Sequence, residues 1–521
     1  MNPSAPELLE RDFGVLTDLV REHARRDPRH LALQDDERRI DYAELDALMD
    51  SVSAGLQRDG VMPGETIAVC AVSSALYAAV FLGALRAGVA VAPLAPGTTP
   101  ASLARMVDDA QARLLFVDAA NAAGFALVDA QRVPRIALDG SAAGRDLHGW
   151  LPAPGTRPQR VQPAPDAPFN IIYSSGTTGE PKGIVQPHAM RWAHVQRGLN
   201  YGYGPEGVTL LATPLYSNTT LVVFFPTIAW GGTVILMGKF DAAAYLVLAE
   251  RHRVTHTMLV PVQYRRLMAL PAFGQHDLGA FHLKFSTSAP FAAELKADVL
   301  ARWPGGLIEF YGMTEGGGTC ILEAHHHPDK LHTVGQPAEG HDIRLIDEAG
   351  IEVAPGEAGE VVGASPSMMT GDHRQPGKTR EAEWFDPTGK RFIRTGDIGR
   401  FGADGFLTLF DRKKDMVISG GFNIYPSDLE AVLQAHPDVA EAAVIAAPSA
   451  QWGETPVAFV VLRTGASVAS DALLAWTNAQ LGKTQRLAAL HLVTELPRSA
   501  IGKVLKRELR DRHLASSLQP D

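Results

Sequence analysis

Cysteine, positive charge and long apolar runs are all scarce in this 521-residue chain. It has two cysteines, Cys70 and Cys320, without a CxxC spacing, so no disulfide framework is expected and a reducing cytosol suits it. Lys and Arg number 48 against 58 Asp and Glu, which gives a formal net charge of −10. This balance argues against nucleic acid or an anionic membrane as the main partner, while a local basic site for an anionic small molecule stays open.

A targeting or membrane-spanning segment is also missing from the pattern. The N-terminal letters MNPSAPELLERDF are acidic and carry no basic region before an apolar run, so no signal peptide is expected. Leu221 to Met237 is the most apolar stretch, but Pro226 and the pair Gly231-Gly232 interrupt it. A spanning helix needs about 20 apolar residues without such breaks. We expect a buried strand–turn–strand there, no stable membrane insertion, and a cytoplasmic protein.

The order of apolar segments predicts an α/β fold. TIAVCAV and VAVAPL are nearly all apolar and flank an Ala-rich helical run that extends through Leu85; RLLFVD, RIALD and NIIYSS follow further along. Such strands, alternating with helices, indicate a sheet covered on both faces. DYAEL predicts a helix capped by Asp41 and Glu44 that ends at Gly60. Residues 151–168 are Pro-rich and polar and predict an exposed linker.

The pattern changes near residue 410 and predicts two domains. From Met416 onward, short strands alternate with the helical runs LEAVLQAH, LLAWTNAQL and KVLKRELRDR. This arrangement is typical of a compact α+β unit of ordinary domain size. We therefore expect a large body of layered α/β subdomains over residues 1–410 and a small α+β domain over residues 411–521. No repeat of solenoid length is present.

The segment Tyr173 to Gly183, YSSGTTGEPKG, carries the most chemical information. It holds three glycines, four hydroxyl side chains and Lys182, directly after an apolar strand. Glycines allow backbone N–H groups to converge on an anion, and the hydroxyls and the ammonium add donors. The segment therefore predicts a triphosphate site, with a surface turn as the alternative. It is not the P-loop NTPase signature, because Pro181 precedes the lysine and Gly183 follows it.

Six motifs in order make nearly the whole chain resemble the adenylate-forming enzymes, which include acyl- and aryl-CoA synthetases, firefly luciferase and the adenylation domains of peptide synthetases. The motifs are FLGALRAGVAVAPLAP, YSSGTTGEPKG, FYGMTE, RTGDIG, DRKKDMVISGGFNIYPSDLE and PRSAIGK. The likeness is greatest to acyl-CoA synthetases. It implies that acid and ATP give acyl-AMP and pyrophosphate, after which CoA gives acyl-CoA and AMP, with Mg²⁺ as the metal. It also implies that the small C-terminal domain is a mobile lid.

The resemblance assigns most nucleotide contacts. Glu315 would hold Mg²⁺ beside the hydroxyl of Thr314, Asp397 would accept from both ribose hydroxyls, and Arg412 would reach the ribose or phosphate. The phosphate loop would consist of Ser174, Ser175, Gly176, Thr177, Thr178 and Gly179 with Lys182. The remaining nucleotide or CoA contacts would be Ser288, Ala289, Pro290, Glu309, Phe310, Tyr311 stacked on adenine, and Ser419, Gly420, Gly421 and Phe422 along the pantetheine tunnel.

Two lysines of the C-terminal domain complete the implied mechanism. Lys503 would enter from that domain and contact the carboxylate, the α-phosphate and their bridging oxygen. A cation aimed at charge that develops in the transition state serves adenylation more than ATP binding. Lys414 falls at the family's hinge, where the small domain would rotate to admit the thiol.

The acid pocket departs from the family pattern. Ser217 follows Tyr216 where many CoA ligases carry a gating histidine, so the pocket mouth is predicted to be small and polar. The glycine triplet Gly316-Gly317-Gly318 is expected to leave room for a bulky or rigid acid. Together with Tyr216, Ser217 and Gly312, the glycines Gly316 and Gly317 are the expected pocket residues. We expect a medium-sized, aromatic or hydroxylated acid. Residues 371–373 read GDH, where the family often has an aromatic after the glycine.

Other interpretations of the same residues stay open at this point. Thr314-Glu315 also fits a helix cap, Tyr311 a core aromatic, Asp397 a turn and Lys503 a solvated charge. The run His325 to His327 predicts a solvated loop rather than a metal site, because adjacent residues cannot easily converge on one ion. The nearest functional alternative is an acyl-AMP ligase that loads a carrier protein. An oxidative luciferase-like enzyme, a catalytically inactive nucleotide sensor and a P-loop ATPase are more distant, and a homodimer is compatible with the resemblance.

Overall fold

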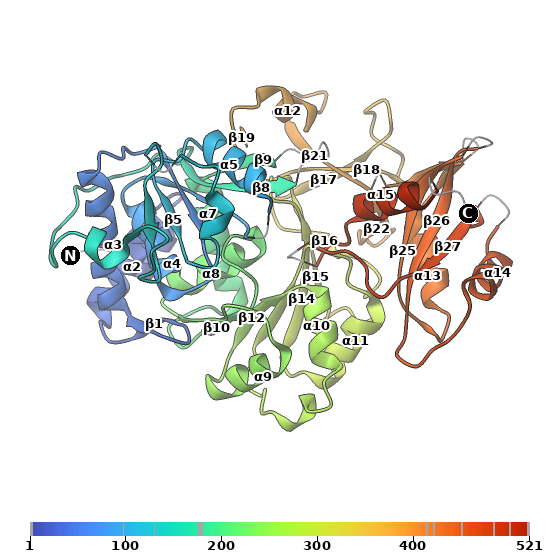
Figure 1. Ribbon diagram of the computed structural model, residues 1–521, viewed down its shortest axis with the longest axis horizontal. Helices are drawn as coiled ribbons and strands as arrows, with labels where there is room; N and C mark the ends of the chain where they lie inside the picture. The colour runs from blue at the N-terminus through green and yellow to red at the C-terminus, as the bar shows by residue number, and fades with distance from the viewer. Residues whose placement is uncertain are drawn as a thin grey trace. The chain divides into compact units, whose positions relative to one another are not determined.

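The computed structural model describes residues 4–96, 98–129, 131–175, 181–412, 415–419, 422–449, 452–482, 485–499 and 502–517. The chain forms two compact units (Figure 1). The first unit comprises Met1–Leu331, Pro337–Asp342 and Gly363–Ile393. The second unit comprises His332–Gln336, Ile343–Val362 and Arg394–Asp521. The expected α/β class, with a large N-terminal body and a small C-terminal domain, is confirmed. The boundary at residue 410 stays a prediction.

An eight-stranded sheet forms one half of the first unit. Its order is β19 (Gly371–Asp372), β9 (Pro181–Pro187), β8 (Pro168–Ser175), β4 (Ala90–Pro93), β3 (Thr66–Cys70), β5 (Leu115–Val117), β6 (Arg135–Ala137) and β7 (Arg145–Asp146). The strands from β8 to β7 run parallel, and β9 and β19 add an antiparallel edge. On β3, Ile67 and Val69 face one core cluster while Ala68 and Cys70 face another. Both faces of the strand are therefore buried, as its continuous apolar sequence predicts.

A nine-stranded sheet forms the other half. Its order is β16 (Gln336–Pro337), β15 (Thr319–Glu323), β14 (Gly306–Gly312), β13 (Leu283–Ser286), β12 (His256–Leu259), β10 (Val208–Leu211), β11 (Thr233–Leu236), β1 (Leu31–Gln34) and β2 (Arg39–Asp41). The strands from β14 to β1 are parallel, whereas β15 and β2 pair antiparallel. Polar residues that follow parallel strands in such a sheet meet at one edge, which is where α/β proteins bind ligands.

Helices cover these two sheets. They are α1 (Ala5–Leu9), α2 (Leu16–Arg26), α3 (Tyr42–Arg58), α4 (Ala75–Arg86), α5 (Pro100–Asp109), α6 (Leu147–Trp150), α7 (His188–Gln196), α8 (Asn218–Ala229), α9 (Ala242–Arg251), α10 (Pro261–Met268), α11 (Ala293–Arg302) and α12 (Pro376–Glu381). Three short 3₁₀ segments join them at η1 (Ala122–Phe125), η2 (Arg197–Tyr201) and η3 (Phe273–Gln275). One core cluster contains side chains from both sheets and from α2, α3, α4 and α8, so these helices pack between the sheets.

The capped helix predicted from DYAEL is confirmed as α3. Asp41 Oδ1 accepts from the Glu44 backbone N–H at 2.8 Å, and Glu44 Oε2 accepts from the Asp41 N–H at 3.1 Å. Each side chain thus satisfies a backbone donor that the first helical turn leaves free. Gly60, with φ of +76°, follows the end of the helix in the left-handed conformation.

The expected strand–turn–strand over Leu221 to Met237 is wrong in its first half. The segment forms most of α8, then a turn at Gly231 with φ of +85°, then β11. Pro226 lies inside the helix, and α8 is buried almost all round. Periodicity cannot distinguish a helix that is apolar on every side from buried strands, and the proline made the strand interpretation attractive.

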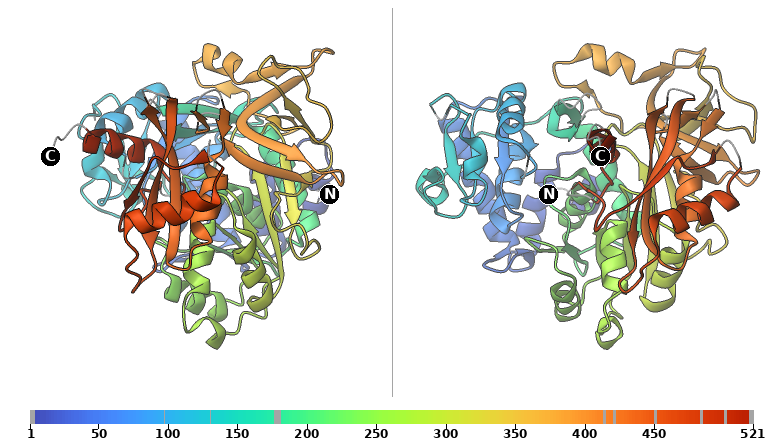
Figure 2. Two further views of the ribbon diagram at one scale, coloured as in Figure 1. Left: turned by 90° about the vertical axis from the view of Figure 1, so that its right-hand side faces the viewer. Right: turned by 45° about the vertical axis from the view of Figure 1, so that its right-hand side comes forward.

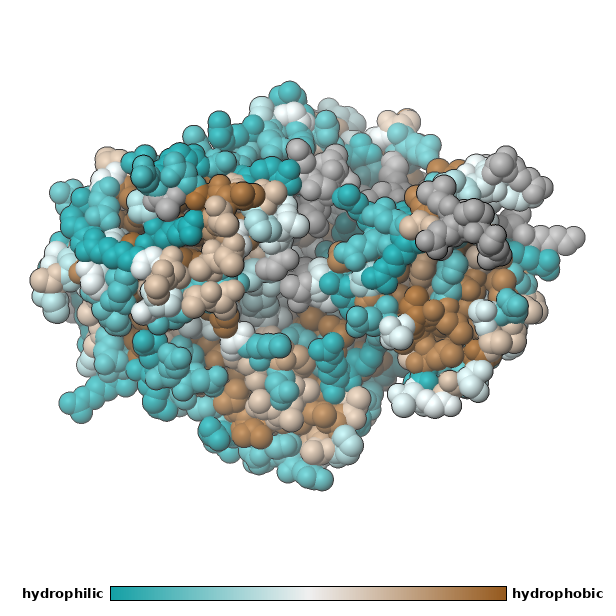
Figure 3. All heavy atoms as spheres, in the orientation of Figure 1, coloured by the Kyte–Doolittle hydropathy of each residue, from teal (hydrophilic) through white to brown (hydrophobic). Residues whose placement is uncertain are grey.

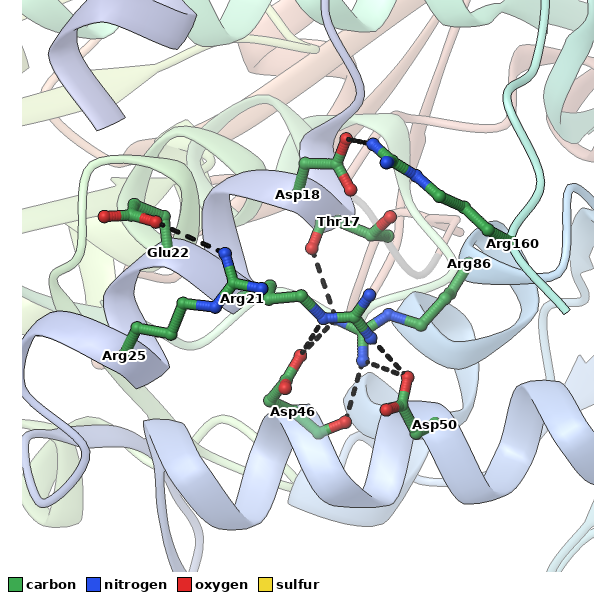
Figure 4. Close-up of polar contacts among 9 residues, drawn as sticks. All are labelled: Thr17, Asp18, Arg21, Glu22, Arg25, Asp46, Asp50, Arg86 and Arg160. Carbon is green, nitrogen blue, oxygen red and sulfur yellow. Dashed lines mark hydrogen bonds and ion pairs between the residues drawn. The ribbon is translucent and has the colours of Figure 1, made fainter. Parts of the chain in front are cut away.

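A buried arginine joins three helices of the first unit (Figure 4). The Arg86 side chain, at the end of α4, is 6% exposed and pairs with Asp46 at 2.5 Å and Asp50 at 2.8 Å, both on α3. Arg21 of α2 reaches the same carboxylates at 3.4 and 2.5 Å. Arg86 also donates to the backbone carbonyl of Thr17 at 3.2 Å. Two cations and two carboxylates therefore hold α2, α3 and α4 together.

Replacing this arginine should destabilise the first unit. Arg86→Met leaves Asp46 and Asp50 with only the more exposed Arg21, so we expect a loss of about 3 kcal/mol in the free energy of unfolding. Arg25→Met is the matched control, because the Arg25 side chain is 55% exposed and, among the described residues, its ion pair is with Glu22 at 3.7 Å. It should change stability by about 0.5 kcal/mol or less. Urea unfolding of the two variants measures the difference. Equal midpoints would show that the buried network contributes nothing.

Two further five-stranded sheets follow, and most of their residues belong to the second unit, whereas β20 belongs to the first. One has the order β17 (Asp342–Ile346), β18 (Gly359–Ala364), β21 (Arg391–Phe401) and β20 (Glu383–Phe385), with β22 (Leu407–Arg412) on β21. The other has the order β24 (Phe422–Ile424), β23 (Val417–Ser419), β26 (Gly453–Leu462) and β25 (Val439–Ser449), with β27 (Ala489–Leu492) on β26. Its strands appear in orange to red in Figure 2.

Helices cover both faces of this last sheet, and they correspond to the three helical runs that the sequence predicts for the C-terminal α+β unit. The helices are α13 (Pro426–Gln434), α14 (Ser470–Gln480) and α15 (Lys506–Ser517). Val444 on β25 packs with Leu429 of α13 and Leu473 of α14, whereas its neighbour Ile445 packs with Leu509 of α15. Alternate residues of one strand thus bury against opposite layers. Apolar side chains also gather on the visible face of this unit in Figure 3.

Candidate active site

The predicted phosphate loop connects two paired strands. Along β8 and β9, Tyr173 pairs with Gly183 and Ser174 with Lys182. The Tyr173 hydroxyl donates to Asp109 Oδ2 of α5 at 2.6 Å, which anchors the end of β8. Residues 176–180, which include the predicted contacts Gly176, Thr177, Thr178 and Gly179, lie outside the described residues, as do the side chains of Ser174 and Ser175. The pairing of β8 with β9 nevertheless fixes the backbone position of Lys182.

Lys182 lies between two carboxylates. Its Nζ is 3.3 Å from Glu315 Oε1 and 3.1 Å from Asp372 Oδ1. The side chain of Asp372 is fully buried, and those of Lys182 and Glu315 are 17% and 14% exposed. Burial acts to lower the pKa of Lys182, but the two carboxylates raise it above its ordinary value. Burial raises the pKa of Asp372, and Lys182 opposes that effect. The lysine is therefore charged and held in place.

Thr314 and Glu315 form a turn between β14 and β15, so the helix-cap alternative is wrong. The Gln186 side chain of β9 donates to the Thr314 carbonyl at 2.7 Å. The Met369 N–H donates to the Glu315 carbonyl at 2.8 Å. These two hydrogen bonds fix the backbone of the turn from both sides. Glu315 is thereby presented to Lys182.

A buried arginine supports the same turn. Arg191 of α7 is 1% exposed and donates to Asn170 Oδ1 at 3.0 Å, to Asn218 Oδ1 at 2.9 Å and to Gln186 Oε1. Among the described residues it forms no ion pair with a carboxylate. Burial lowers its pKa to about 9, so the cation persists at neutral pH. No sequence motif marks this network, because its four members, Arg191 included, come from four separate elements and meet only in the folded chain.

Asp397 and Arg412 meet within the second unit. They are register partners on β21 and β22, and Arg412 Nε lies 3.2 Å from Asp397 Oδ1. Asp397 is inside a long strand, so the simple-turn alternative is wrong. Gly396 before it has φ of +70°, a conformation that favours glycine. The two predicted ribose and phosphate contacts are thus adjacent, and their roles stay predictions.

Ser288 follows β13 in a strained conformation. Its φ is +79°, unusual for a residue with a side chain, and its hydroxyl lies 2.6 Å from that of Thr219 on α8. Ser217 is 7% exposed at the start of α8, and Tyr216 before it is half-buried. Strain of this kind is retained at functional sites, so the prediction that residues 288–290 contact a ligand gains a physical reason. Ala289 is half-buried and Pro290 exposed.

Gly316 and Gly317 leave no open space where their side chains would lie, and the assignment of Gly312, Gly316 and Gly317 to the acid pocket stays a prediction. A Cβ on Gly316, whose φ is +73°, would lie 1.9 Å from the Ser367 carbonyl oxygen. A Cβ on Gly317 would lie 2.5 Å from Ile393 Cβ, and one on Gly312 would be 3.3 Å from Thr319 Oγ1. Protein atoms already fill the space beside Gly316 and Gly317. These two glycines permit close packing rather than a larger pocket.

The adenine motif is partly engaged in packing. Glu309 is 4% exposed and forms an ion pair with the buried Lys296 of α11. Phe310 stacks on Phe285 with ring centroids 5.6 Å apart, whereas Tyr311 is half-buried. The Glu309 side chain is therefore occupied within the protein. Tyr311 is the better placed of the three for a ligand, and all three contacts stay predictions.

The remaining C-terminal predictions fall on turns. Ser419 of β23 pairs with Phe422 of β24, while Gly420, Gly421, the Phe422 side chain and the predicted hinge Lys414 lie outside the described residues. Lys503 is exposed in a turn where the Ser499 N–H donates to its carbonyl at 2.8 Å. His325 Nδ1–H donates to the Leu307 carbonyl at 3.1 Å, and no group of three metal-ligating side chains occurs within the described part of the chain.

Comparison with known families decides the class. The pattern of the AMP-binding enzyme family matches residues 20–371, and that of the AMP-binding enzyme C-terminal domain matches residues 428–503. The chain belongs to the AMP-binding enzyme family. As an AMP-binding enzyme, it carries Lys182, Thr314 and Glu315 within the first match and Lys503 at the end of the second.

Three relatives of this AMP-binding enzyme span almost the whole chain. Feruloyl-CoA synthase of Amycolatopsis sp is 32% identical over 94% of this chain and 97% of its own length. Fatty acid–[acyl-carrier-protein] ligase ScoC of Streptomyces coeruleorubidus is 30% identical over 95% and 96%. The crystal structure of ATP-bound MatB from Rhodopseudomonas palustris superposes with a TM-score of 0.87 at 30% identity, covering 95% of this chain and 99% of MatB.

These comparisons confirm the adenylate-forming family and the class of AMP-forming acid–thiol ligase expected from the six motifs. No helix within the described residues is both long and apolar enough to span a membrane.

Proposed function

We propose that this enzyme joins an aromatic carboxylic acid to coenzyme A through an acyl-adenylate, with ATP and Mg²⁺. A free carboxylate acylates a thiol poorly, because oxide would have to leave. Transfer of AMP to the carboxylate, with pyrophosphate leaving, gives a mixed anhydride that a thiol can attack. The reaction brings two anions together, so the site must supply positive charge and fixed donors.

The observation that carries the proposal is the group Lys182, Glu315 and Asp372. The charged ammonium of Lys182, near the start of β9, lies 3.3 Å from the carboxylate of Glu315, and hydrogen bonds hold the turn that carries Glu315. Lys182 would bind the β- and γ-phosphates. Thr314 would offer its hydroxyl beside them, and Asp397 and Arg412 would bind the ribose and α-phosphate.

The donor set also fits a magnesium ion. Carboxylate oxygens are the ligands that Mg²⁺ prefers, and both oxygens of the buried Asp372 lack a hydrogen-bond partner among the described atoms apart from the Lys182 ion pair. Glu315 would hold the ion, with Asp372 close to the same lysine. When bound, the ion neutralises charge on the phosphate oxygens.

An aromatic acid is supported by the named activity of the feruloyl-CoA relative and by the apolar and hydroxyl side chains near Tyr216 and Ser217. CoA is proposed as the thiol for the same reason. A carrier protein is the second candidate, because ScoC, of similar identity, is named for loading one. Buried, unpaired Cys70 and Cys320 suit a reducing compartment, and we propose a cytoplasmic location.

A screen of carboxylic acids for acid-dependent pyrophosphate release, run with and without CoA, tests the proposal. Aromatic acids should release pyrophosphate and AMP and should form a CoA thioester. Formation of ADP would contradict the adenylate mechanism. Thioester formation only after a carrier protein is added would favour the second candidate.

A further inference from the structure

An arginine and two histidines lie beside the expected acid pocket in the first unit. Arg197 begins η2 directly after α7, and His194 lies one turn earlier on the same helical face. His341 lies beside β15, where the Thr319 N–H donates to its Nδ1 at 2.9 Å. Each of the three side chains is half-buried rather than enclosed. Part of the surface of each residue therefore stays exposed.

Two hydrogen bonds place this cluster next to the expected pocket residues. Arg197 Nη2 donates to Ser367 Oγ at 3.2 Å, and the Ser367 carbonyl is the atom that a side chain at position 316 would strike. Thr319, which holds His341, is the register partner of Gly312. Gly312 and Gly316 flank the Thr314–Glu315 turn. The cluster consequently lies on the side of that turn where the acid is expected.

Each of the two histidines has an Nε2–H group that can donate a hydrogen bond. His341 Nδ1 accepts from Thr319, so its proton sits on Nε2. Arg191 Nη1 lies 3.5 Å from His194 Nδ1 and can only donate, which puts the His194 proton on Nε2 as well. Burial lowers the pKa of His341 to about 4, with Arg197 adding to the effect. Burial also holds the pKa of His194 well below its usual value, with Arg197 adding to the effect. Both rings are neutral donors at pH 7.

Arg197 has no carboxylate partner among the described residues. Neither Arg197 nor the buried Arg191 forms an ion pair there, and the described hydrogen bond of the Arg197 side chain goes to Ser367 Oγ. A guanidinium removed from water is costly unless an anion accompanies it. A ligand that supplies an anionic oxygen would satisfy Arg197 and the two imidazole N–H groups together.

We propose that Arg197, with His194 and His341, binds an anionic oxygen at the end of the substrate acid opposite the carboxylate that is activated. The inference rests on the proposed ligase function and narrows its substrate to acids with a second carboxylate or a phenolate. These residues determine specificity and take no part in bond making.

A panel of acids that differ only at the far end tests the proposal. The probes are cinnamate, 4-methylcinnamate, 4-hydroxycinnamate and 4-carboxycinnamate, with benzoate and terephthalate as a shorter pair. For the wild type we expect kcat/KM in pyrophosphate exchange to be at least about 10-fold higher for an acid with a distal oxygen than for its unsubstituted partner. Preference for the 4-carboxy acid would assign a carboxylate, and preference for the 4-hydroxy acid a phenolate.

Variants at Arg197 separate recognition from packing. Arg197→Met should lower kcat/KM by about 30-fold or more for the preferred acid and by less than about 3-fold for cinnamate. Arg197→Lys retains the charge and should keep part of the preference. Arg266→Met, at an exposed position of α10, is the matched control and should leave the ratio unchanged.

Three outcomes would overturn the inference. The first is a wild-type enzyme that uses cinnamate or 4-methylcinnamate as well as the substituted acids, which is measured without any variant. The second is an equal loss for every acid in Arg197→Met, which would show a structural role only. The third, inactivity toward every carboxylic acid tested, would overturn the proposed function and the inference with it, whereas activity without a distal preference overturns the inference alone.

Discussion

Lys503→Ala should abolish formation of the acyl-adenylate while leaving thioester formation from supplied acyl-AMP largely intact. We expect acid-dependent pyrophosphate exchange to fall by about 10³-fold, since a cation that meets charge only as it develops acts on the transition state more than on bound ATP. The KM for ATP should change far less. Single-turnover assays of the two half-reactions measure the difference.

The geometry of the Lys503 turn supports this separation of roles. The Lys503 N–H donates to Ser499 Oγ at 3.2 Å, and Gly502, with φ of +78°, closes the turn. Arg498 donates to the Gly502 carbonyl at 2.7 Å and reaches Glu441 of β25 at 3.0 Å. The backbone is thus tied to the C-terminal sheet, so removal of the lysine side chain should not alter the loop.

Lys239→Ala is the matched control, because Lys239 is an exposed lysine of the first unit. It should leave both half-reactions unchanged. An equal loss of adenylation and thiolation in Lys503→Ala would contradict the assignment and would indicate a general folding or binding defect.

Glu315→Gln should lower adenylation by about 10²- to 10³-fold and should weaken its dependence on Mg²⁺. The substitution keeps the shape of the side chain but removes the negative charge 3.3 Å from Lys182 Nζ. Because Gln186 and Met369 hold the backbone of the turn, the loss should come from the carboxylate alone. Pyrophosphate exchange across a magnesium titration measures it, and excess ATP should not restore the rate.

Glu323→Gln provides the control for this experiment. Glu323 lies on β15 a few residues later, and its side chain is exposed. The variant should keep the wild-type rate and metal dependence. If Glu315→Gln retained more than half of the adenylation rate with an unchanged magnesium midpoint, Glu315 would not be a metal ligand.

The order of apolar segments predicted most of the fold because local signals controlled it. The cap at Asp41 and Glu44 produced α3, and strands such as TIAVC became buried members of parallel sheets. The failure at Leu221 to Met237 has the opposite cause. A segment that is apolar on every side has no amphipathic period, so its secondary structure depends on neighbours that the sequence does not place.

The candidate site shows the same division. Lys182 and Glu315 were predictable from motifs, and the structure brings them together. Asp372 was only noted as unusual, and Arg191 gave no signal, because their significance lies in burial and in partners far along the chain. The glycine triplet predicted open space beside the site, but Gly316 and Gly317 are packed against protein atoms.

The Lys182–Glu315 pair also has a consequence for how the enzyme is made. The two residues are 133 positions apart, and closing a loop of that length costs about 4 kcal/mol of chain entropy before any contact rewards it. The phosphate-loop hairpin can form early because β8 and β9 are neighbours in sequence. The carboxylates arrive only when β14, β15 and β19 have emerged from the ribosome and joined their sheets. A growing chain therefore acquires its complete triphosphate site late in synthesis, and nascent fragments that end before residue 372 should not bind ATP as the finished protein does.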